Sequence, residues 1–198
     1  MLTLAGFSAR PTFQELIPAD YLMQQFVQRA RGEARLGPQV PVTDDLFTQI
    51  RESIKDYPTV CTKPHLKSVT AYTVPSTAKN WHAVALSGRG LCYCSMIGNC
   101  RLWIYRQKNG KLHKLFAADS ASAFAFLPSR AGTPLLVVWT RESAVEQFVF
   151  VYKLDFGEYI EAASWKELYQ YEADDEEFRV HDTPKIYSTM PLGSFLPD

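Results

Sequence analysis

The sequence predicts a mainly β protein of the α+β class, with two N-terminal amphipathic helices packed on an antiparallel sheet domain of about eight strands. Three observations lead to this prediction. Two early segments place apolar residues at helical spacing, the chain after about residue 66 alternates apolar and polar residues, and the alternating part contains an internal repeat. We expect a helical segment over residues 1–60 and a β domain over 61–198, together forming one compact unit.

The two predicted helices differ in how clearly their ends are marked. The first, over residues 19–35, has no proline, many good helix formers and a modest apolar stripe. In the second, Thr43 is a natural N-cap, Asp44 and Asp45 occupy the first turn, and Pro58 closes the segment. Both helices are amphipathic, so each needs an apolar surface to pack against.

The internal repeat is clearest in two predicted hairpins. The segment RLWIYRQKNGKLHKLF (101–116) aligns with FVFVYKLDFGEYIEAA (148–163), and Gly110 falls opposite Gly157. A glycine at that place predicts a tight turn with positive φ. Looser matches extend the repeat to two four-strand units, 67–116 and 122–164, and KIYSTM near the C-terminus predicts a further strand. We expect the two units to pack as a sandwich or to form a curved, barrel-like sheet.

The unit that ends in LWIYRQKNGKLHKLF resembles the blade repeats of the FG-GAP and VCBS type. More narrowly, residues 80–164 are similar to a group of small bacterial exported proteins of unknown function, which combine a close Cys pair, a WIY strand and a VY hairpin. FG-GAP units often carry calcium loops between their first two strands. The corresponding turns here, VPSTAKN and LPSRAGT, have no carboxylate, so we expect no calcium there. The resemblance implies no catalytic residue.

Three of the four cysteines lie within CYCSMIGNC, residues 92–100. A zinc site would need a fourth ligand from Cys61, His65 or His82, and the C-x-C-x5-C spacing is not that of a usual zinc knuckle. A redox dithiol prefers C-x-x-C at the start of a helix, whereas this cluster precedes a predicted strand.

A disulfide between Cys94 and Cys100 is the simplest interpretation of this cluster. The Gly-Asn pair between them predicts a turn that brings the two sulfurs together, and the resembled group has its Cys pair here. Cys61–Cys92 is the candidate second bridge. Free buried thiols in a cytosolic protein are the alternative.

Composition and charge bear on the class of partner. Twenty-one basic residues balance twenty-one acidic ones, so the chain lacks the basic excess typical of nucleic-acid binding, and no apolar run is long enough for a membrane span. The first residues do not form a secretory signal. We therefore expect a cytoplasmic protein, or a periplasmic or secreted one if a signal was removed.

Candidate binding residues are strand aromatics and an acidic run, and core packing is the competing interpretation for each aromatic. They are Trp103, Tyr105, Trp139, Tyr152, Asp174 and Asp175. The sequence contains no standard catalytic or His-based metal motif, and we expect no cofactor, no metal and no catalytic residue. The expected function is a non-enzymatic binding or inhibitory module for a protein partner, in the bacterial envelope. The alternatives are a small glycan-directed hydrolase with its site between helices and sheet, and a toxin-neutralising immunity protein.

Overall fold

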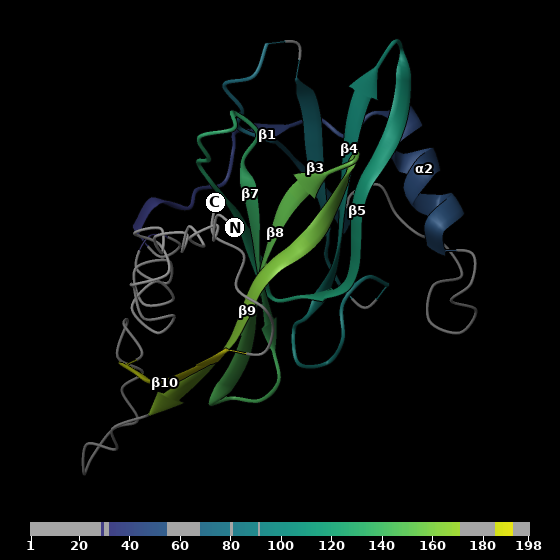
Figure 1. Ribbon diagram of the computed structural model, residues 1–198. Coiled ribbons are helices and arrows are strands. Elements are labelled where there is room, and N and C mark those ends of the chain that lie inside the picture. The colour runs from purple at the N-terminus through teal and green to yellow at the C-terminus, as the bar shows by residue number, and fades with distance from the viewer. Residues whose placement is uncertain are drawn as a thin grey trace, which may run out of the picture.

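The computed structural model describes residues 29, 32–54, 68–79, 81–90, 92–170 and 185–191 (Figure 1). These residues form the helix α2 (Asp44–Ile54) and ten strands. The strands are β1 (Gln39–Val40), β2 (Val69–Thr73), β3 (His82–Gly88), β4 (Cys100–Lys108), β5 (Lys111–Ala121), β6 (Ala123–Leu127), β7 (Leu135–Arg141), β8 (Glu146–Asp155), β9 (Glu158–Gln170) and β10 (Lys185–Pro191).

The strands form two antiparallel sheets, each of them a meander. The first sheet has the order β1-β2-β3-β4-β5 and the second the order β10-β9-β8-β7-β6. The mainly β class is therefore confirmed. The predicted four-strand units overlap β2–β5 and β6–β9, whose last strands continue to Ala121 and Gln170. Each sheet has one more strand, so the ten strands of the described residues exceed the expected eight. One of these, β10, covers the KIYSTM segment.

The two predicted hairpins are both present and end in the same kind of turn. Asn109 and Gly110 have φ of 52° and 73°, and Phe156 and Gly157 have φ of 46° and 93°. Two successive residues with positive φ define the two-residue turn whose twist matches that of the flanking strands. The internal repeat of the two four-strand units remains a prediction.

Helix α2 confirms the second predicted helix, including its cap. The backbone N–H of Leu46 donates to Oγ1 of Thr43 at 3.4 Å, and the N–H of Phe47 donates to the Thr43 carbonyl at 3.0 Å. Leu46 and Ile50 are buried. Most of the predicted helix 19–35 lies outside the described residues, of which Arg29, Gly32 and Glu33 are helical. The expected pair of N-terminal helices is therefore not shown.

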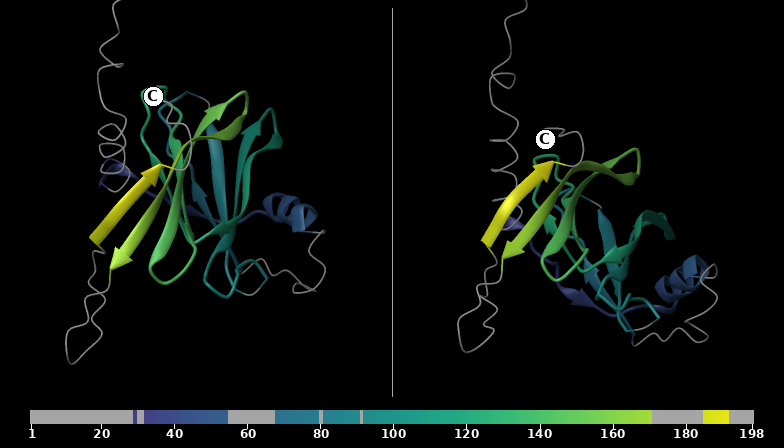
Figure 2. Two further views of the ribbon diagram at one scale, coloured as in Figure 1. Left: turned by 60° about the horizontal axis from the view of Figure 1, so that its bottom comes forward. Right: turned by 90° about the horizontal axis from the view of Figure 1, so that it is seen from below.

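Figure 2 shows the two sheets as two layers, with α2 on the outer side of the first sheet. Apolar side chains between the layers form the inter-sheet core: Val74, Ala83, Ala85, Leu102, Ile104, Leu115, Phe116, Ala121, Phe124, Phe126, Leu136, Val138 and Tyr159. A second cluster lies between α2 and the first sheet: Leu46, Ile50, Val69, Ala71, Leu86, Tyr93, Trp103 and Tyr105. A third lies on the far face of the second sheet and includes Val149, Val151 and Trp165.

The two matching hairpins present opposite faces to the inter-sheet core. In β4, Ile104 points into this core and Tyr105 points toward α2. In β8, Tyr152 packs against the inter-sheet core and Val151 lies on the far face. This result follows if the two meanders are stacked in the same orientation. The face that meets the core in one sheet is then equivalent to the face that points away from the core in the other.

The segment 34–40 crosses the edges of both sheets, and we call it the edge segment. Arg35 and Phe126 exchange two backbone hydrogen bonds of 2.9 and 2.8 Å at the edge of β6. A few residues later, Gln39–Val40 pairs with β2 in the other sheet. A Cβ atom on Gly37 would overlap the carbonyl oxygen of Thr73, so this close approach requires glycine.

Asn99 connects the loop before β4 to the end of β7. Its side chain is buried, its amide nitrogen donates to the Arg141 carbonyl at 2.7 Å, and its amide oxygen accepts from the Arg141 N–H at 2.8 Å. The side chain thus satisfies both backbone groups of a residue in the other sheet, as a neighbouring strand would.

We predict that Asn99→Ala lowers the free energy of unfolding by about 2–3 kcal/mol, because two hydrogen bonds are lost and the Arg141 backbone groups are left without partners. Ser95→Ala, which removes only the oxygen that accepts from the Asn99 N–H at 3.3 Å, should cost about 1 kcal/mol or less. Urea unfolding measures both. Equal effects for the two variants would contradict the special role of the Asn99 amide.

Burial raises the pKa of Tyr152 to about 12, and the nearby Glu161 carboxylate adds to the effect. An unfolded tyrosine has a pKa of about 10. The stability linked to this shift is therefore complete below about pH 10 and is lost as the pH rises toward 12. We predict that Tyr152→Phe weakens the alkaline decline in the free energy of unfolding, measured by urea titrations on both sides of about pH 10. An unchanged decline would count against this assignment.

Candidate functional site

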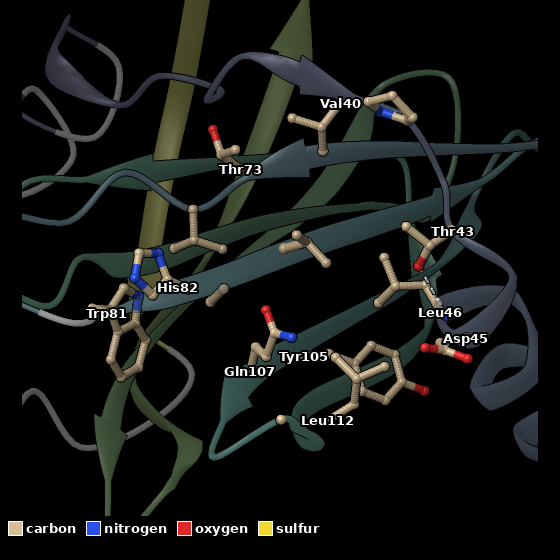
Figure 3. A pocket seen from close by; sticks show the side chains of 15 residues that line it. Val40, Thr43, Asp45, Leu46, Thr73, Trp81, His82, Tyr105, Gln107 and Leu112 are labelled. Atoms are coloured by element: carbon tan, nitrogen blue, oxygen red, sulfur yellow. Dashed lines mark hydrogen bonds between the residues drawn. The ribbon is translucent and has the colours of Figure 1, made fainter.

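A groove of about 470 Å³ lies between α2 and the outer face of the first sheet (Figure 3). Its floor includes side chains from three neighbouring strands, Val84 of β3, Tyr105 of β4 and Leu112 of β5. Val40 of β1 and Leu46 of α2 line one side. The groove is thus a largely apolar depression built on paired strands.

The groove exists because α2 covers only part of the first sheet. Leu46 and Ile50 of the helix pack on the cluster that contains Leu86, Trp103 and Tyr105. Farther along the same strands, the register aligns His82, Gln107 and Leu112 in one row across β3, β4 and β5. His82 and Gln107 are exposed, so this end of the face remains open.

Polar groups lie around the apolar floor. In Figure 3, Asp45 in the first turn of α2 lies at one end, His82 and Trp81 lie at the opposite end, and Gln107 lies between them. The Nε1 atom of Trp81 is buried and has no hydrogen-bond partner among the described residues. The Arg106 guanidinium carbon lies 4.4 Å from the centre of the Trp81 ring, a cation–π contact that holds the indole in place.

This arrangement suits a short segment of polypeptide. The floor can bury an apolar side chain, and the amide of Gln107 and the imidazole of His82 can bond main-chain amide groups. The Asp45 carboxylate can accept from an N–H group or a cation. The first turn of α2 is a favourable place for this negative charge.

The predicted binding aromatics do not converge on one surface. Trp103 and Tyr105 are each 3% exposed beneath α2, and of the two only Tyr105 lines the groove. Trp139 packs partly buried against the far face of the second sheet. Tyr152 stacks on Phe150 at 6.3 Å within the sandwich. Asp174 and Asp175 lie outside the described residues.

Sequence reasoning missed Asp45, His82, Gln107 and Leu112 as members of one site. The pairing of Gln107 with Leu112 could have been predicted from the sequence, because a two-residue turn at Asn109–Gly110 fixes the register of its strands. The pairing of His82 with Gln107 was not, since the loop between β3 and β4 does not determine a register.

The predicted disulfide between Cys94 and Cys100 is confirmed. It closes a short loop in which the Ser95 N–H donates to the Asn99 carbonyl at 2.7 Å, and Met96 at the tip is fully exposed. These two sulfurs are therefore not zinc ligands. Cys92 is also disulfide-bonded, and Cys61, its predicted partner, lies outside the described residues.

The two turns in which the resembled repeats often hold calcium touch each other. The Thr77 N–H donates to the Gly132 carbonyl at 3.1 Å, and the Ser76 hydroxyl donates to the same oxygen at 2.7 Å. The contact joins the β2–β3 loop to the β6–β7 loop, so these turns serve here to connect the two sheets.

Comparison with protein-family models, with curated proteins and with solved structures finds no match to this chain. The resemblance to FG-GAP and VCBS repeats therefore remains a prediction. Within the part of the chain that the structure describes, no helix combines the length and apolar character needed to cross a membrane. Among the same residues, no group of three or more His, Cys, Asp or Glu side chains is arranged to hold a metal ion.

We predict that the double variant Cys94→Ala/Cys100→Ala stays folded but loses about 2 kcal/mol of unfolding free energy, as expected for a short closed loop. The hairpin persists because the Arg101 N–H still donates to the Tyr93 carbonyl, at 2.8 Å in the native protein. Urea unfolding measures the loss, and alkylation followed by mass spectrometry tests the bond itself. Alkylation of Cys94 and Cys100 in freshly purified native protein would rule the disulfide out.

Proposed function

We propose that the chain is a non-enzymatic module that binds a protein partner, and that the groove beside α2 receives a segment of this partner. The observation that carries the proposal is the open row of His82, Gln107 and Leu112 beside an apolar floor. An apolar depression with a few convergent polar groups is the usual composition of a binding site. An immunity protein that neutralises a toxin is one form of such a module.

The groove needs little rearrangement to bind. Its floor belongs to three hydrogen-bonded strands, and its wall belongs to a helix whose first turn is capped by Thr43. A preformed site loses less conformational entropy on binding than a mobile one. Each Å² of apolar surface that the partner buries on the floor contributes about 25 cal/mol.

The disulfide supports a location in an oxidising compartment, since such bonds persist in secreted and periplasmic proteins and are rare in the cytosol. We therefore propose that the partner is met in the bacterial envelope or outside the cell.

A small hydrolase is the second candidate, because the groove lies between a helix and the sheet, where its active site was expected. The lining contains Asp45 and His82, which are able to transfer protons. Figure 3 places them at opposite ends of the groove. A joint acid–base step needs groups within hydrogen-bond reach of one reacting centre, so their separation favours binding.

We predict that Leu112→Glu weakens partner binding at least about tenfold, because it places a charge on the apolar floor. Val145→Glu is the matched control, since Val145 is 42% exposed in the turn between β7 and β8, away from the groove. The partner is captured with wild-type protein from the envelope fraction of the producing cells, identified by mass spectrometry, and its affinity for each variant is measured by calorimetry.

Equal affinity of the partner for wild type and Leu112→Glu would remove the groove from the proposal. Turnover in a broad hydrolase panel that Leu112→Glu and Asp45→Asn both abolish, with no partner recovered, would establish the enzyme instead.

A further inference from the structure

The turn between β8 and β9 carries a phenylalanine in an unfavourable place. Phe156 has a φ of 46°, in the left-handed region, and its side chain is fully exposed, at 103%. A bulky residue with positive φ is a rare outlier, since its Cβ approaches the following carbonyl oxygen. Full exposure of the ring leaves this strain without compensation from packing inside the chain.

The matching turn shows the residue that this geometry prefers. Asn109 occupies the same position of the β4–β5 turn with a φ of 52°, and asparagine before glycine is the favoured pair for such a turn. The chain therefore uses the stable residue in one hairpin and an exposed aromatic in the other. Local strain retained with no structural benefit is characteristic of functional positions.

The residue pairs that close the two turns are opposite in charge. Asp155 and Glu158 form the pair that closes the Phe156 turn, whereas Lys108 and Lys111 close the Asn109 turn. The next residue of β9 that faces outward, Ile160, is 40% exposed and adds a second apolar side chain near the tip. The β8–β9 tip is thus an apolar knob with acidic residues at its base.

From this geometry we infer that Phe156 is an anchor that inserts into an apolar pocket, rimmed by Lys or Arg side chains, on a partner protein. Exposed aromatic side chains that enter a pocket dominate the energetics of many interfaces. The carboxylates of Asp155 and Glu158 complement a basic rim and disfavour an anionic membrane surface. The anchor is held by strands of ten and thirteen residues, so little conformational freedom is lost on docking.

This inference rests on the proposed function in one respect, that the partner is a protein, but it names a different surface. Figure 2 shows the β8–β9 turn at one end of the second sheet, whereas the groove lies on the outer face of the first. Either surface can therefore be wrong while the other is right.

The test uses Phe156→Asn, which copies the matching turn. Because it relieves the backbone strain, the variant should fold and melt about 2–4 °C higher than wild type, so loss of binding cannot come from unfolding. A random peptide library displayed on phage is selected on wild-type protein, and the enriched peptides are measured against Phe156→Asn, Leu112→Glu and Asn109→Phe.

We expect peptides with an apolar residue flanked by Lys or Arg, which bind Phe156→Asn at least about tenfold more weakly and bind Leu112→Glu as they bind wild type. Asn109→Phe adds an aromatic among lysines and should gain no such peptides. Enriched peptides that bind Phe156→Asn unchanged overturn the anchor, and their loss in Leu112→Glu would at the same time support the groove. Absence of any enrichment also overturns the anchor.

Two further measurements test the other surfaces that Phe156 could contact, a membrane and a second copy of the chain. Flotation with neutral and with anionic phospholipid vesicles should show no binding, and vesicle binding that Phe156→Asn abolishes would overturn the protein partner in favour of a membrane. Sedimentation over a range of concentrations should show no self-association that depends on Phe156. A dimer lost in Phe156→Asn would make the partner a second copy of the chain and overturn the basic pocket of a different protein.

Discussion

The passage of the chain from one sheet to the other at Ser122 is the constraint on which the architecture depends. Only this residue separates β5 from β6, and its N–H and hydroxyl both donate to the Trp139 carbonyl, at 2.7 and 3.0 Å. The Thr140 hydroxyl donates a hydrogen bond of 2.6 Å to the Ser120 carbonyl. Because these bonds hold the end of β5 against β7, the two meanders face each other and bury one core between them.

This stacking explains where the aromatic residues lie. Side chains at equivalent positions of the two hairpins alternate in the same way along the strand. The set that faces the inter-sheet core in the first sheet, however, matches the set that faces away from it in the second. Tyr105 consequently lies beneath α2, and its counterpart Tyr152 lies between the sheets. Residues that match in sequence were therefore separated by tertiary packing, and a single aromatic face did not result.

The features that the sequence predicted depend on residues close together in the chain, and those that it did not predict depend on residues far apart in the chain. Thr43 caps α2, the glycines at 110 and 157 define two turns, and Cys94 and Cys100 flank a turn, so each could be recognised from neighbouring residues. The groove could not, because it depends on the register of β3 against β4 and on the part of the sheet that α2 leaves open. Strand β1 was not predicted, because two residues are too few to show the alternation of apolar and polar side chains.

The edge segment has a consequence for the order in which the chain folds. The hairpins join strands that are neighbours in sequence and can form early. Arg35, in contrast, pairs with Phe126 at a sequence separation of 91 residues (126 − 35). We therefore expect this segment to close late in folding. Until it occurs, β2 and β6 both expose unpaired backbone groups, and a nascent chain at high concentration can satisfy them with the edge segment of a neighbour.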